Sequence, residues 1–455
     1  MKNMSLIRMA DVCGGVYYGE ESKKDIEVSS ITTDSRKVEE GCLFIAIKGE
    51  RVDGHSFIPS VFEKGALCVL SEQKLENPQG PYILVKSSLT AIKKLAQYYR
   101  KQLDIKVVGI TGSVGKTSTK EMIASVLSEK YTVLKTLGNF NNELGLPLTI
   151  FRLREEDEIA VLEMGISDFG EMHRLSEIAC PDVCVITNIG QCHLEYLHDR
   201  DGILRAKSEI FDFIAEDGTI VLNGDDDKLS GLTQVKGIIP HFFGIETKRE
   251  LYADELKNLG LKGIRCKIHA GEESFQVDIP IPGYHMVQNA LAATAVGLSL
   301  GLTLEEIHDG IEKLEAISGR FHLIETEKYT IIDDCYNANP VSMKASLTAL
   351  QDGLFRKVAI LGDMGELGLD EAELHYGVGE YAADLKIDLF LCVGTLCKNI
   401  AQGIREKNPD KEVQEFESVE ELLLNLSQIL KEKDTILVKA SHFMKFDQIV
   451  SYLEK

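Results

Sequence analysis

The sequence predicts an α/β protein of three domains built around mainly parallel sheets. β-branched apolar runs alternate with amphipathic helical stretches along most of the chain, a rhythm typical of parallel strands covered by helices. One of these runs is joined to the next helical stretch by a glycine-rich loop. The chain also has 455 residues, which is more than one hydrophobic core accommodates.

The first two predicted domains differ in size. Residues 1–84 alternate short strand-like runs with turns, as a small α/β domain does. Residues 85–317 open with the amphipathic helix SLTAIKKLAQYYRKQL and the strand KVVGIT, and further apolar runs follow with helical patterns between them. This pattern predicts a mainly parallel central sheet. Residues 249–282 alternate in the manner of antiparallel strands, and the helical run VQNALAATAVGLSLG closes the domain.

The third predicted domain, residues 318–455, repeats the α/β rhythm. Its strand-like runs are YTIIDD, KVAILG, DLFLCVG and TILVKAS, and the helical stretch SVEELLLNLSQILKEK precedes the last of them. We therefore expect a Rossmann-like α/β domain at the C-terminal end.

Composition narrows the possible partners. The formal net charge of −22 argues against nucleic acid, because phosphate backbones are bound by basic surfaces. No uninterrupted apolar run is long enough to span a membrane, and the N-terminus lacks the pattern of a signal peptide.

The ten cysteines form no CxxC pair and predict no zinc site or disulfide framework. We expect a cytoplasmic monomer with small-molecule partners and no transmembrane segment.

The stretch GITGSVGKTSTK predicts a phosphate-binding loop. It lies between a β-branched strand and a helix, its glycines allow backbone N–H groups to face an anion, and the helix N-terminus adds partial positive charge. Lys116 would reach the β- and γ-phosphates, and the Thr117 hydroxyl would hold Mg²⁺. Ile110 stands where the strict motif has glycine. The residues predicted at the nucleotide are Gly112, Ser113, Val114, Gly115, Lys116, Thr117 and Ser118.

This loop makes the central domain one of the P-loop ATPase type. Two more candidate site residues lie where strands of that domain end: Glu163 closes the run AVLE, and His193 follows TNIG. A single histidine is more often structural than a ligand, and hard cations prefer oxygen ligands. The pattern alone leaves both roles open.

Lys207 lies within an apolar helix face formed by Ile203, Ile210, Phe211 and Ile214. Two interpretations remain open. The ammonium group extends past the apolar face to water, or it is buried and its lowered pKa makes the amine reactive.

Several motifs, taken in order, resemble the ATP-dependent Mur ligases of peptidoglycan synthesis. They are TGSVGKTS, GNFNNELGLP, LEMG, TNIGQCHLEYL and AKSEIF. DDCYNANPVSM and LGDMGELG are similar to the members that add D-alanyl-D-alanine to a UDP-N-acetylmuramoyl-tripeptide. The resemblance extends over all three domains and implies an ATP-dependent amide-bond ligase. In such an enzyme the tripeptide carboxylate takes the γ-phosphate of ATP, and the dipeptide amine then displaces phosphate from the acyl phosphate.

The resemblance also implies roles for the central residues. Lys116, Glu163, His193 and Lys207 would be catalytic. Thr117 and Glu163 would hold a first Mg²⁺, and His193 with Lys207 a second. Lys207 would be carbamylated by CO₂, and an apolar setting suits that reaction because only the unprotonated amine attacks CO₂.

Further positions carry over by motif. His285 and Asn289 match the segment that contacts adenine, and Arg320 and Asp334 match nucleotide contacts from the third domain, with Asp333 as an alternative to Asp334. Asn289 could instead cap or pack, and Arg320 could be a surface charge. The substrate-binding residues implied are Ser35, Arg36, Asp53 and His55 for the UDP-sugar and Asn337 and Asn339 for the dipeptide. Asn141, Asn142, Asn188 and Lys439 are also implied to bind substrate. Residues 1–84 would bind the UDP-sugar, 85–317 ATP, and 318–455 would close on ATP and bind the dipeptide.

One segment departs from the family pattern. The family's C-terminal KGSR is here KASH, so His442 replaces an arginine.

The sequence leaves other functions as alternatives. The ligase that adds the third amino acid is one of them, but its Asp-Asn-Pro-Arg motif is absent from this sequence. A folylpolyglutamate-type ligase fits the first domain poorly. A GTPase switch would show an NKxD motif, which is also absent, and a non-catalytic P-loop homologue would not need Lys116, Glu163, His193 and Lys207 together.

Overall fold

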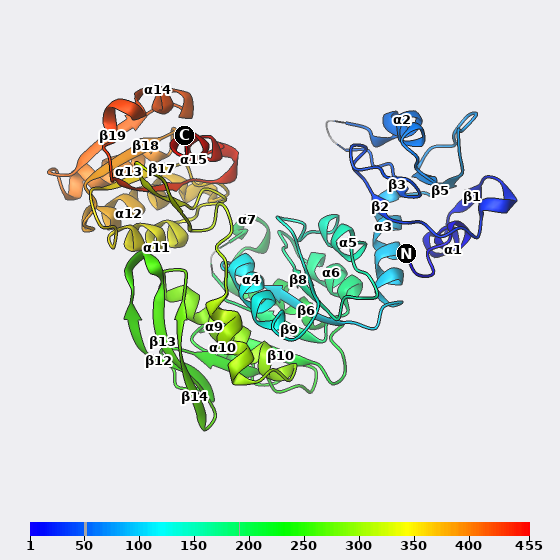
Figure 1. Cartoon of the computed structure of the whole chain (residues 1–455), viewed down its shortest axis with the longest axis horizontal. Coiled ribbons are helices and arrows are strands. Elements are labelled where there is room, and N and C mark those ends of the chain that lie inside the picture. Colours follow the sequence, from blue (N-terminus) through cyan, green and yellow to red (C-terminus); the bar gives the residue numbers. More distant parts are fainter. Residues whose placement is uncertain (50–51, 191) are drawn as a thin grey trace.

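The computed structural model describes residues 1–49, 52–190 and 192–455. Glu50 and Arg51, next to the DGH motif, and Gln191, in TNIGQCHLEYL, lie outside the described residues. The described strands form three sheets of five, nine and six strands, each accompanied by helices (Figure 1). The predicted three-domain α/β fold is therefore confirmed.

The N-terminal sheet has the order β1-β5-β4-β3-β2, and only β1 is antiparallel to its neighbour. The strands are short, and the apolar side chains of β3 and β4 are buried, whereas Val16 and Tyr18 of β1 are exposed. The elements are α1 (Leu6–Cys13), β1 (Val16–Tyr18), β2 (Ile31–Thr32), β3 (Leu43–Ile45), α2 (Ile58–Glu63), β4 (Cys68–Ser71) and β5 (Tyr82–Leu84).

The central sheet has the order β14-β13-β12-β11-β10-β9-β6-β8-β7. The strands from β7 to β12 pair in parallel, and β12, β13 and β14 pair antiparallel. This confirms the antiparallel strands expected at residues 249–282. Its strands are β6 (Lys106–Thr111), β7 (Val133–Lys135), β8 (Ile159–Glu163), β9 (Val183–Ile186), β10 (Thr219–Asn223), β11 (His241–Gly244), β12 (Leu251–Asn258), β13 (Ile264–Ala270) and β14 (Glu273–Ile279).

Helices pack against this sheet. The apolar side chains Met122, Ile123, Val126 and Leu127 of the helix after the glycine-rich loop are all buried, as the 3.6-residue period predicts. The helices are α3 (Ser88–Arg100), α4 (Lys116–Leu127), α5 (Gly145–Ile150), α6 (Glu171–Ala179), α7 (Leu194–Leu197), α8 (Arg200–Ser208), α9 (Tyr284–Ser299) and α10 (Leu304–Glu312).

The C-terminal sheet has the order β15-β16-β20-β17-β18-β19 and is parallel except at β15. Its strands are β15 (His322–Glu325), β16 (Thr330–Asp333), β17 (Lys357–Gly362), β18 (Leu389–Val393), β19 (Glu412–Phe416) and β20 (Thr435–Lys439). Its helices are α11 (Pro340–Leu350), α12 (Glu371–Ala383), α13 (Cys397–Lys407), α14 (Val419–Ile429) and α15 (Asp447–Leu453).

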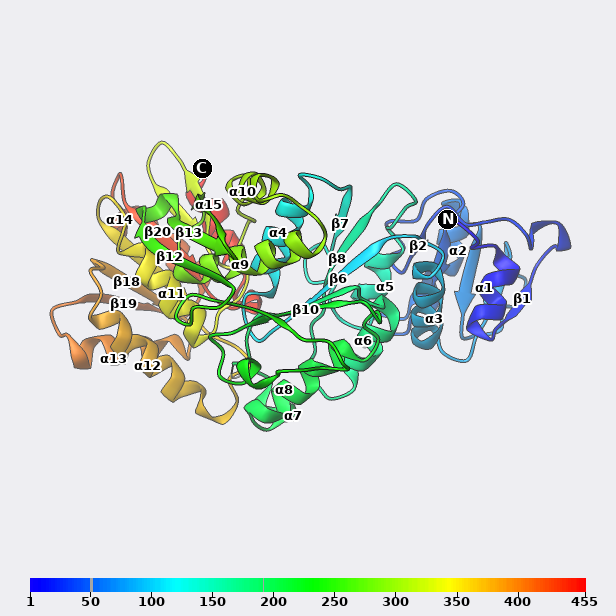
Figure 2. The same ribbon diagram turned by 90° about the horizontal axis from the view of Figure 1, so that it is seen from below.

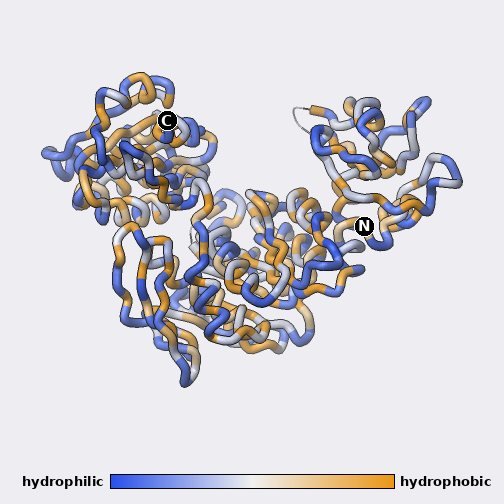
Figure 3. Tube along the Cα trace, viewed as in Figure 1, coloured by the Kyte–Doolittle hydropathy of each residue, from blue (hydrophilic) through white to orange (hydrophobic). Residues whose placement is uncertain are grey.

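The N-terminal and C-terminal domains lie at opposite ends of the central domain (Figures 1 and 2). Hydrophobic residues follow the strands, while the outer turn of the β13–β14 hairpin is hydrophilic (Figure 3). Among the described residues, no helix is both long and apolar enough to cross a bilayer. The boundaries 1–84, 85–317 and 318–455 stay a prediction, although each sheet falls within one of these ranges.

Candidate active site

The glycine-rich loop joins β6 to α4 at the carboxyl edge of the central sheet. Gly115 precedes α4 with a φ of 82°, a left-handed conformation that glycine adopts without steric cost. The Lys116 ammonium group donates to the Gly112 carbonyl at 2.9 Å, so its side chain folds back over the loop. Thr117 and Ser118 follow in the first turn of α4. This arrangement places backbone N–H groups and a lysine around one anion site.

The loop is braced by the residues that follow β9. The side chain of Asn188 accepts from the Val114 N–H at 3.0 Å and donates to the Val114 carbonyl at 3.0 Å. The Thr187 hydroxyl donates to the same carbonyl at 2.7 Å, and the Ser113 hydroxyl accepts from Gly190 N–H at 2.9 Å. Since both amide atoms of Asn188 are engaged, its observed role is to hold the loop. A substrate contact by Asn188 stays a prediction.

Glu163 ends β8 next to the loop and is 2% exposed. Its Oε1 accepts from the Asn141 amide at 2.8 Å, and its backbone N–H donates to the Thr136 hydroxyl at 3.0 Å. Its Oε2 is buried and has no hydrogen-bond partner within the described part of the chain. A buried carboxylate oxygen without a donor is costly, so this atom fits a cation as its missing partner.

Lys207 lies near the end of α8 and is 1% exposed. Burial, and then the positive charge of Lys116, lower the pKa of Lys207 to about 7. No ion pair or hydrogen bond of its ammonium group is found within 1–49, 52–190 and 192–455. The interpretation in which the lysine extends to water is therefore wrong, because the side chain is buried. That its amine is reactive stays a prediction.

His193 lies in the same region, with a φ of 51°. Burial, followed by the nearby charges of Lys207 and Lys116, lowers the pKa of this imidazole. A neutral imidazole is the form that ligates metals. The loop lysine, His193 and Lys207 are thus within electrostatic reach of one another.

Asp334 follows β16 in the C-terminal domain and forms a buried ion pair. Its Oδ2 accepts from the Lys439 ammonium at 2.6 Å and from the Ser346 hydroxyl at 2.5 Å. Its Oδ1 accepts from the Phe321 N–H at 3.1 Å. Its neighbour Asp333 instead accepts from the Gly319 N–H at 2.6 Å. The two aspartates therefore have different partners, which the sequence could not separate.

Arg320, Tyr336 and His442 form a layered group in the C-terminal domain. The Arg320 guanidinium lies 4.3 Å from the centroid of the Tyr336 ring, and the ring of His442 lies 5.6 Å from that centroid on a tilted plane. Where the family pattern has arginine, this chain places an imidazole beside Tyr336. Arg320 is therefore held against an aromatic ring rather than free on the surface.

The two residues expected at the adenine differ in burial: Asn289 is buried and His285 is exposed. Asn289 of α9 is buried, and its Oδ1 accepts from the Thr119 hydroxyl of α4 at 2.9 Å, so it packs α9 against the helix that follows the loop. His285 is exposed at the start of α9 and is within electrostatic reach of Asp334 and Lys439. This histidine thus faces groups of the C-terminal domain.

Three of the predicted asparagines have local partners. Asn142 accepts from the Gly145 N–H at 2.8 Å. Asn339 caps α11 by accepting from the Ser342 N–H at 2.9 Å. Asn337 accepts from the Ala338 N–H at 2.9 Å, and its carbonyl accepts from Lys439 at 3.2 Å. Substrate contacts of these three residues stay predictions.

The residues expected at the UDP-sugar follow two neighbouring parallel strands, β2 and β3. The Arg36 guanidinium donates to both oxygens of Asp34, which lowers the pKa of Asp34 to about 2. The Ser35 carbonyl accepts from Lys64 at 2.8 Å. His55 interacts through Nδ1 with Asp53 Oδ1 at 2.6 Å. None of the residues expected at ATP belongs to this sheet.

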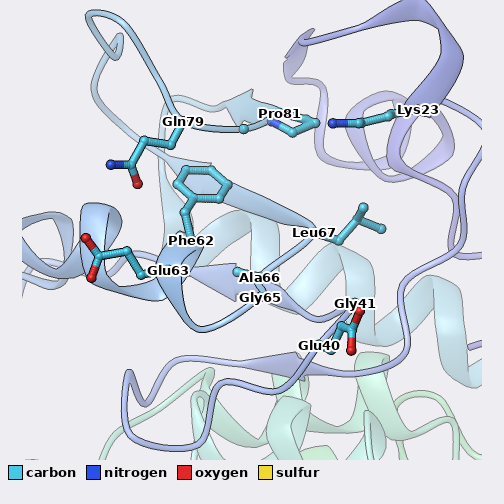
Figure 4. A pocket seen from close by; sticks show the side chains of 11 residues that line it. Lys23, Glu40, Gly41, Phe62, Glu63, Gly65, Ala66, Leu67, Gln79 and Pro81 are labelled. Atoms are coloured by element: carbon cyan, nitrogen blue, oxygen red, sulfur yellow. The ribbon is translucent and has the colours of Figure 1, made fainter.

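A cavity of about 430 Å³ lies in the N-terminal domain (Figure 4). Phe62, Leu67 and Pro81 line it, and Lys23 and Glu63 lie at its rim. Its lining includes the residues just before β3, β4 and β5, so it lies at the sheet edge opposite the DSR and DGH segments. Another cavity, of about 450 Å³, lies between α11 and α12 beside Pro340 and Lys344.

Sequence reasoning missed Lys120, Thr136 and Ser346. Lys120 is 1% exposed and donates to the Thr136 carbonyl at 2.7 Å. A signal for it existed, because Lys120 precedes Ile123 by three residues and Leu127 by seven, which places it on the buried face of α4. Thr136 and Ser346 carry no comparable signal, since their partners are distant in sequence.

The predicted metal ligands differ from an ordinary cluster of metal-binding side chains. Within the described ranges, no group of three or more His, Cys, Asp or Glu side chains could hold a metal ion. The predicted set differs in kind, since it has one carboxylate, one imidazole, one hydroxyl and one lysine. The buried Oε2 of Glu163, which has no hydrogen-bond donor among the described residues, and the position of Thr117 at the loop fit a hard cation.

Three family models match the chain. They are described as the Mur ligase family catalytic domain, over residues 27–108, the Mur ligase middle domain, over residues 110–297, and the Mur ligase glutamate ligase domain, over residues 319–442. The UDP-N-acetylmuramoyl-tripeptide–D-alanyl-D-alanine ligase of Bacillus subtilis is 40% identical and covers 94% of this chain and 93% of its own. Its namesake from Escherichia coli is 34% identical, over 100% and 99%.

Solved structures are also similar along nearly the whole chain. MurF from Acinetobacter baumannii has a TM-score of 0.90 and 33% identity, covering 99% of both chains. MurF ligase from Thermotoga maritima in complex with ADP has a TM-score of 0.81 and 31% identity, covering 93% of this chain and 97% of its own.

Proposed function

The chain belongs to the Mur ligase family, and from this premise we propose that it joins D-alanyl-D-alanine to UDP-N-acetylmuramoyl-tripeptide with consumption of ATP. The products are the UDP-MurNAc-pentapeptide, ADP and phosphate. One observation carries the proposal: the buried amine of Lys207, for which no partner is found among the described residues, lies within electrostatic reach of the phosphate-loop residue Lys116. A nucleotide-driven switch has no need of such an amine, and the relatives named above are ligases of this kind.

ATP would bind at the loop between β6 and α4. Lys116 and the backbone N–H groups of the loop supply positive charge where the phosphates would lie. The tripeptide carboxylate and the triphosphate repel each other, so this reaction needs charge neutralisation more than acid–base catalysis. Lys116 is therefore proposed as a catalytic residue that stabilises the transferring phosphoryl group.

Mg²⁺ would be held at the same edge of the sheet. Thr117 and Glu163 are the proposed ligands of one ion, and the free Oε2 of Glu163 supports this assignment. When bound, Mg²⁺ would neutralise phosphate charge. The chain's own contribution is to fix Glu163 through Asn141 and Thr136 before any ion arrives.

Lys207 is proposed to be carbamylated and, with His193, to serve a second Mg²⁺. A pKa of about 7 leaves a large fraction of the amine unprotonated at neutral pH, which is the form that attacks CO₂. The new bond joins Nζ to the CO₂ carbon, and one proton leaves the nitrogen. The carbamate is an anionic oxygen donor, which suits a hard cation.

The chemistry proposed at this site has two steps. A carboxylate oxygen of the tripeptide attacks the γ-phosphorus, the bond from that phosphorus to the β–γ bridging oxygen breaks, and an acyl phosphate and ADP result. The dipeptide amine then attacks the acyl carbon, and phosphate leaves with the bonding electron pair. The nitrogen loses one proton as the amide forms.

The domains would divide the substrates among them. The segments of Ser35–Arg36 and Asp53–His55 in the N-terminal sheet would bind the UDP-sugar, for which a guanidinium is suited. Arg320 and Asp334 would approach the nucleotide from the C-terminal domain. Asn337 and Asn339 would line the dipeptide side, next to the cavity between α11 and α12, which has Lys344, Asp370 and Glu373 in its lining. That lining offers both signs of charge to a zwitterionic dipeptide.

A single assay tests the reaction. With ATP, Mg²⁺, UDP-MurNAc-tripeptide and D-Ala-D-Ala present, we expect ADP to form only when both acceptor substrates are supplied. ADP release that is indifferent to the dipeptide would refute the assignment. Running the assay with tripeptides ending in lysine or in diaminopimelate determines which one is used, and a free amino acid in place of the dipeptide tests the alternative ligase.

The proposed setting is the cytoplasm. ATP and a UDP-linked precursor are the expected substrates, and the ten cysteines are free thiols, as in a reducing compartment. We further propose that the protein acts as a monomer, which sedimentation in the presence and absence of substrates would test.

A further inference from the structure

Lys120 is a buried lysine that the reaction described above does not use. It lies one turn after Lys116 on α4, and its side chain is among the largest that are fully buried. Lys120 turns inward toward β7 and β8. Burying a lysine is costly unless its charge is paired and hydrogen-bonded.

The contacts of Lys120 join three segments. Its ammonium group donates to the Thr136 carbonyl at 2.7 Å, which lies where the chain leaves β7. It lies 3.1 Å from Glu121 Oε1 on its own helix and 3.8 Å from Glu163 Oε2 at the end of β8. One side chain thus links α4 to the segment that carries Asn141 and to the proposed metal carboxylate.

The two carboxylate oxygens of Glu163 have different neighbours: Oε1 accepts a hydrogen bond, and Oε2 lies near a positive charge. Oε1 accepts a hydrogen bond from Asn141 at 2.8 Å. Oε2 lies 3.8 Å from the Lys120 ammonium, close enough for electrostatic attraction but beyond hydrogen-bond distance. The lysine therefore orients the carboxylate without occupying a lone pair of Oε2, which stays available to another partner.

We propose that Lys120 is a positioning residue for Glu163: it holds the carboxylate and the segment from Thr136 to Asn141 in the orientation that presents Oε2 to a divalent cation at the phosphate loop. This inference rests on the proposed function, in which Glu163 is a metal ligand. Partners that orient a ligating group are characteristic of metal sites, and their loss typically costs about 10–100-fold in metal affinity or activity.

A purely structural role explains these contacts less well. Glu121 has a second cationic partner, Lys135, so it does not need Lys120 for charge balance. The Thr136 carbonyl could be satisfied by a neutral donor. What requires a cation at this place is the buried Oε2 of Glu163, which accepts no hydrogen bond from any part of the chain that the structure describes.

The test replaces Lys120 with methionine, which has a similar length and no charge. The probe is Mn²⁺ with ADP, and its binding to the full-length protein is measured by electron paramagnetic resonance. We expect Lys120→Met to weaken Mn²⁺ binding by about 10–100-fold and to lower kcat, with the KM for each acceptor substrate unchanged. Thermal unfolding in EDTA reports any loss of stability separately.

Lys135→Met is a control matched in charge. It also removes one positive charge from the group formed with Glu121, but the Lys135 side chain is 40% exposed. Among the described residues, the Thr136 carbonyl and Glu163 Oε2 are contacted by the ammonium group of Lys120 and not by that of Lys135. We expect less than about fivefold change in Mn²⁺ binding, as for an exposed pair. If Lys120 acted only through its charge, both variants would bind Mn²⁺ more tightly, because each removes a repelling cation. That result overturns the proposal.

A second variant covers a failure of Lys120→Met to fold. Lys120→Gln retains a donor for the Thr136 carbonyl but lacks the charge that faces Glu163, and we expect it to fold and to bind Mn²⁺ with the same weakened affinity. Normal Mn²⁺ binding in a folded Lys120→Gln variant contradicts the inference. Failure of the unmodified protein to form the amide product would count against the proposed function only, since Mn²⁺ binding is measured without turnover.

Discussion

Lys207 shows how burial and a nearby like charge set the chemistry of a residue. Its ammonium group has lost its water and lies near the positive charge of Lys116, and its pKa falls from the ordinary 10.5 to about 7. A lysine at the protein surface is almost fully protonated at neutral pH and does not attack CO₂. At this site the neutral amine is abundant at a pH where the protein would work.

Carbamate formation at Lys207 should therefore depend on pH with a definite sign. At a constant concentration of dissolved ¹³CO₂, we expect a protein-bound carbamate signal in the ¹³C NMR spectrum above pH about 7, where the amine is largely neutral. The signal should decrease as the pH falls below about 7, because protonation removes the nucleophile. Lys207→Met should lack it at every pH.

The same site can be checked by activity. Lys207→Ala should lose most ligase activity, since about 10–100-fold losses are usual when a metal site is disturbed. Short carboxylic acids added to the buffer should restore part of it by supplying the missing anion. Full activity of the untreated variant would contradict a carbamate role.

Asp334 and Asp333 show the limit of sequence reasoning at this scale. The motif DDCYNANP narrows the choice to two adjacent residues, but nothing local decides between them. The decision lies with Lys439 and Ser346, which are distant in sequence and meet Asp334 only in the folded domain. In the same way, the bond from Asn141 to Glu163 depends on a loop path that no periodic pattern encodes.

Breaking the buried pair of Asp334 and Lys439 should destabilise the C-terminal domain strongly. Lys439 is 2% and Asp334 12% exposed at the side chain, and removing one partner of a buried pair costs about 3–5 kcal/mol. We expect Asp334→Ala to lower the free energy of unfolding of this domain by about that amount in urea denaturation. Lys398→Ala, which removes an exposed pair with Glu417, should cost less than about 1 kcal/mol.

At the scale of elements, the phosphate loop depends on a close approach between two segments. A Cβ atom placed on Gly112 would lie 1.9 Å from the Thr187 hydroxyl oxygen, and that hydroxyl also holds the Val114 carbonyl. The glycine is therefore required because the segment after β9 packs directly against the loop, in addition to any contact with phosphate.

Gly112→Ala should thus abolish nucleotide binding while leaving most of the fold intact. The methyl group displaces Thr187, and the loop loses one of its braces, so the affinity for ADP measured by calorimetry should fall below detection. Gly231→Ala is the control, because a Cβ there meets nothing within 4 Å. Normal ADP binding by Gly112→Ala would show that Thr187 moves aside at little cost.

Elements were predictable from sequence where burial imposes a period. The strand before the loop, the face of α4 and the antiparallel strands β12 to β14 follow from apolar patterns. β7 and β19 were not predicted, because most of their side chains are only partly buried or exposed and their sequences carry polar residues. Such strands are specified by their neighbours in the sheet more than by their own composition.

At the scale of the whole molecule, the proposed substrates would start far apart. The residues expected at the UDP-sugar follow strands of the N-terminal sheet, whereas Asp334 follows β16 of the C-terminal sheet and Lys439 ends β20. These two sheets lie at opposite ends of the central domain (Figure 1). The sequence predicts which domain holds which substrate, but it contains no signal for the relative placement of domains. Bound ligands commonly change such a placement, because loops and domains close around substrates in many enzymes.

Substrate binding should bring the outer domains together, since the acyl carbon and the dipeptide amine must come into contact for the amide bond to form. We expect the radius of gyration measured by small-angle X-ray scattering to decrease when a non-hydrolysable ATP analogue and UDP-MurNAc-tripeptide are both added. Either ligand alone should have a smaller effect.

Scattering avoids cysteine labelling, which the ten free thiols would complicate. Lys116→Ala should stay extended under the same conditions, because closure from the C-terminal side needs the nucleotide in place. Unchanged scattering of the unmodified protein with both ligands bound would mean that the substrates meet without domain movement.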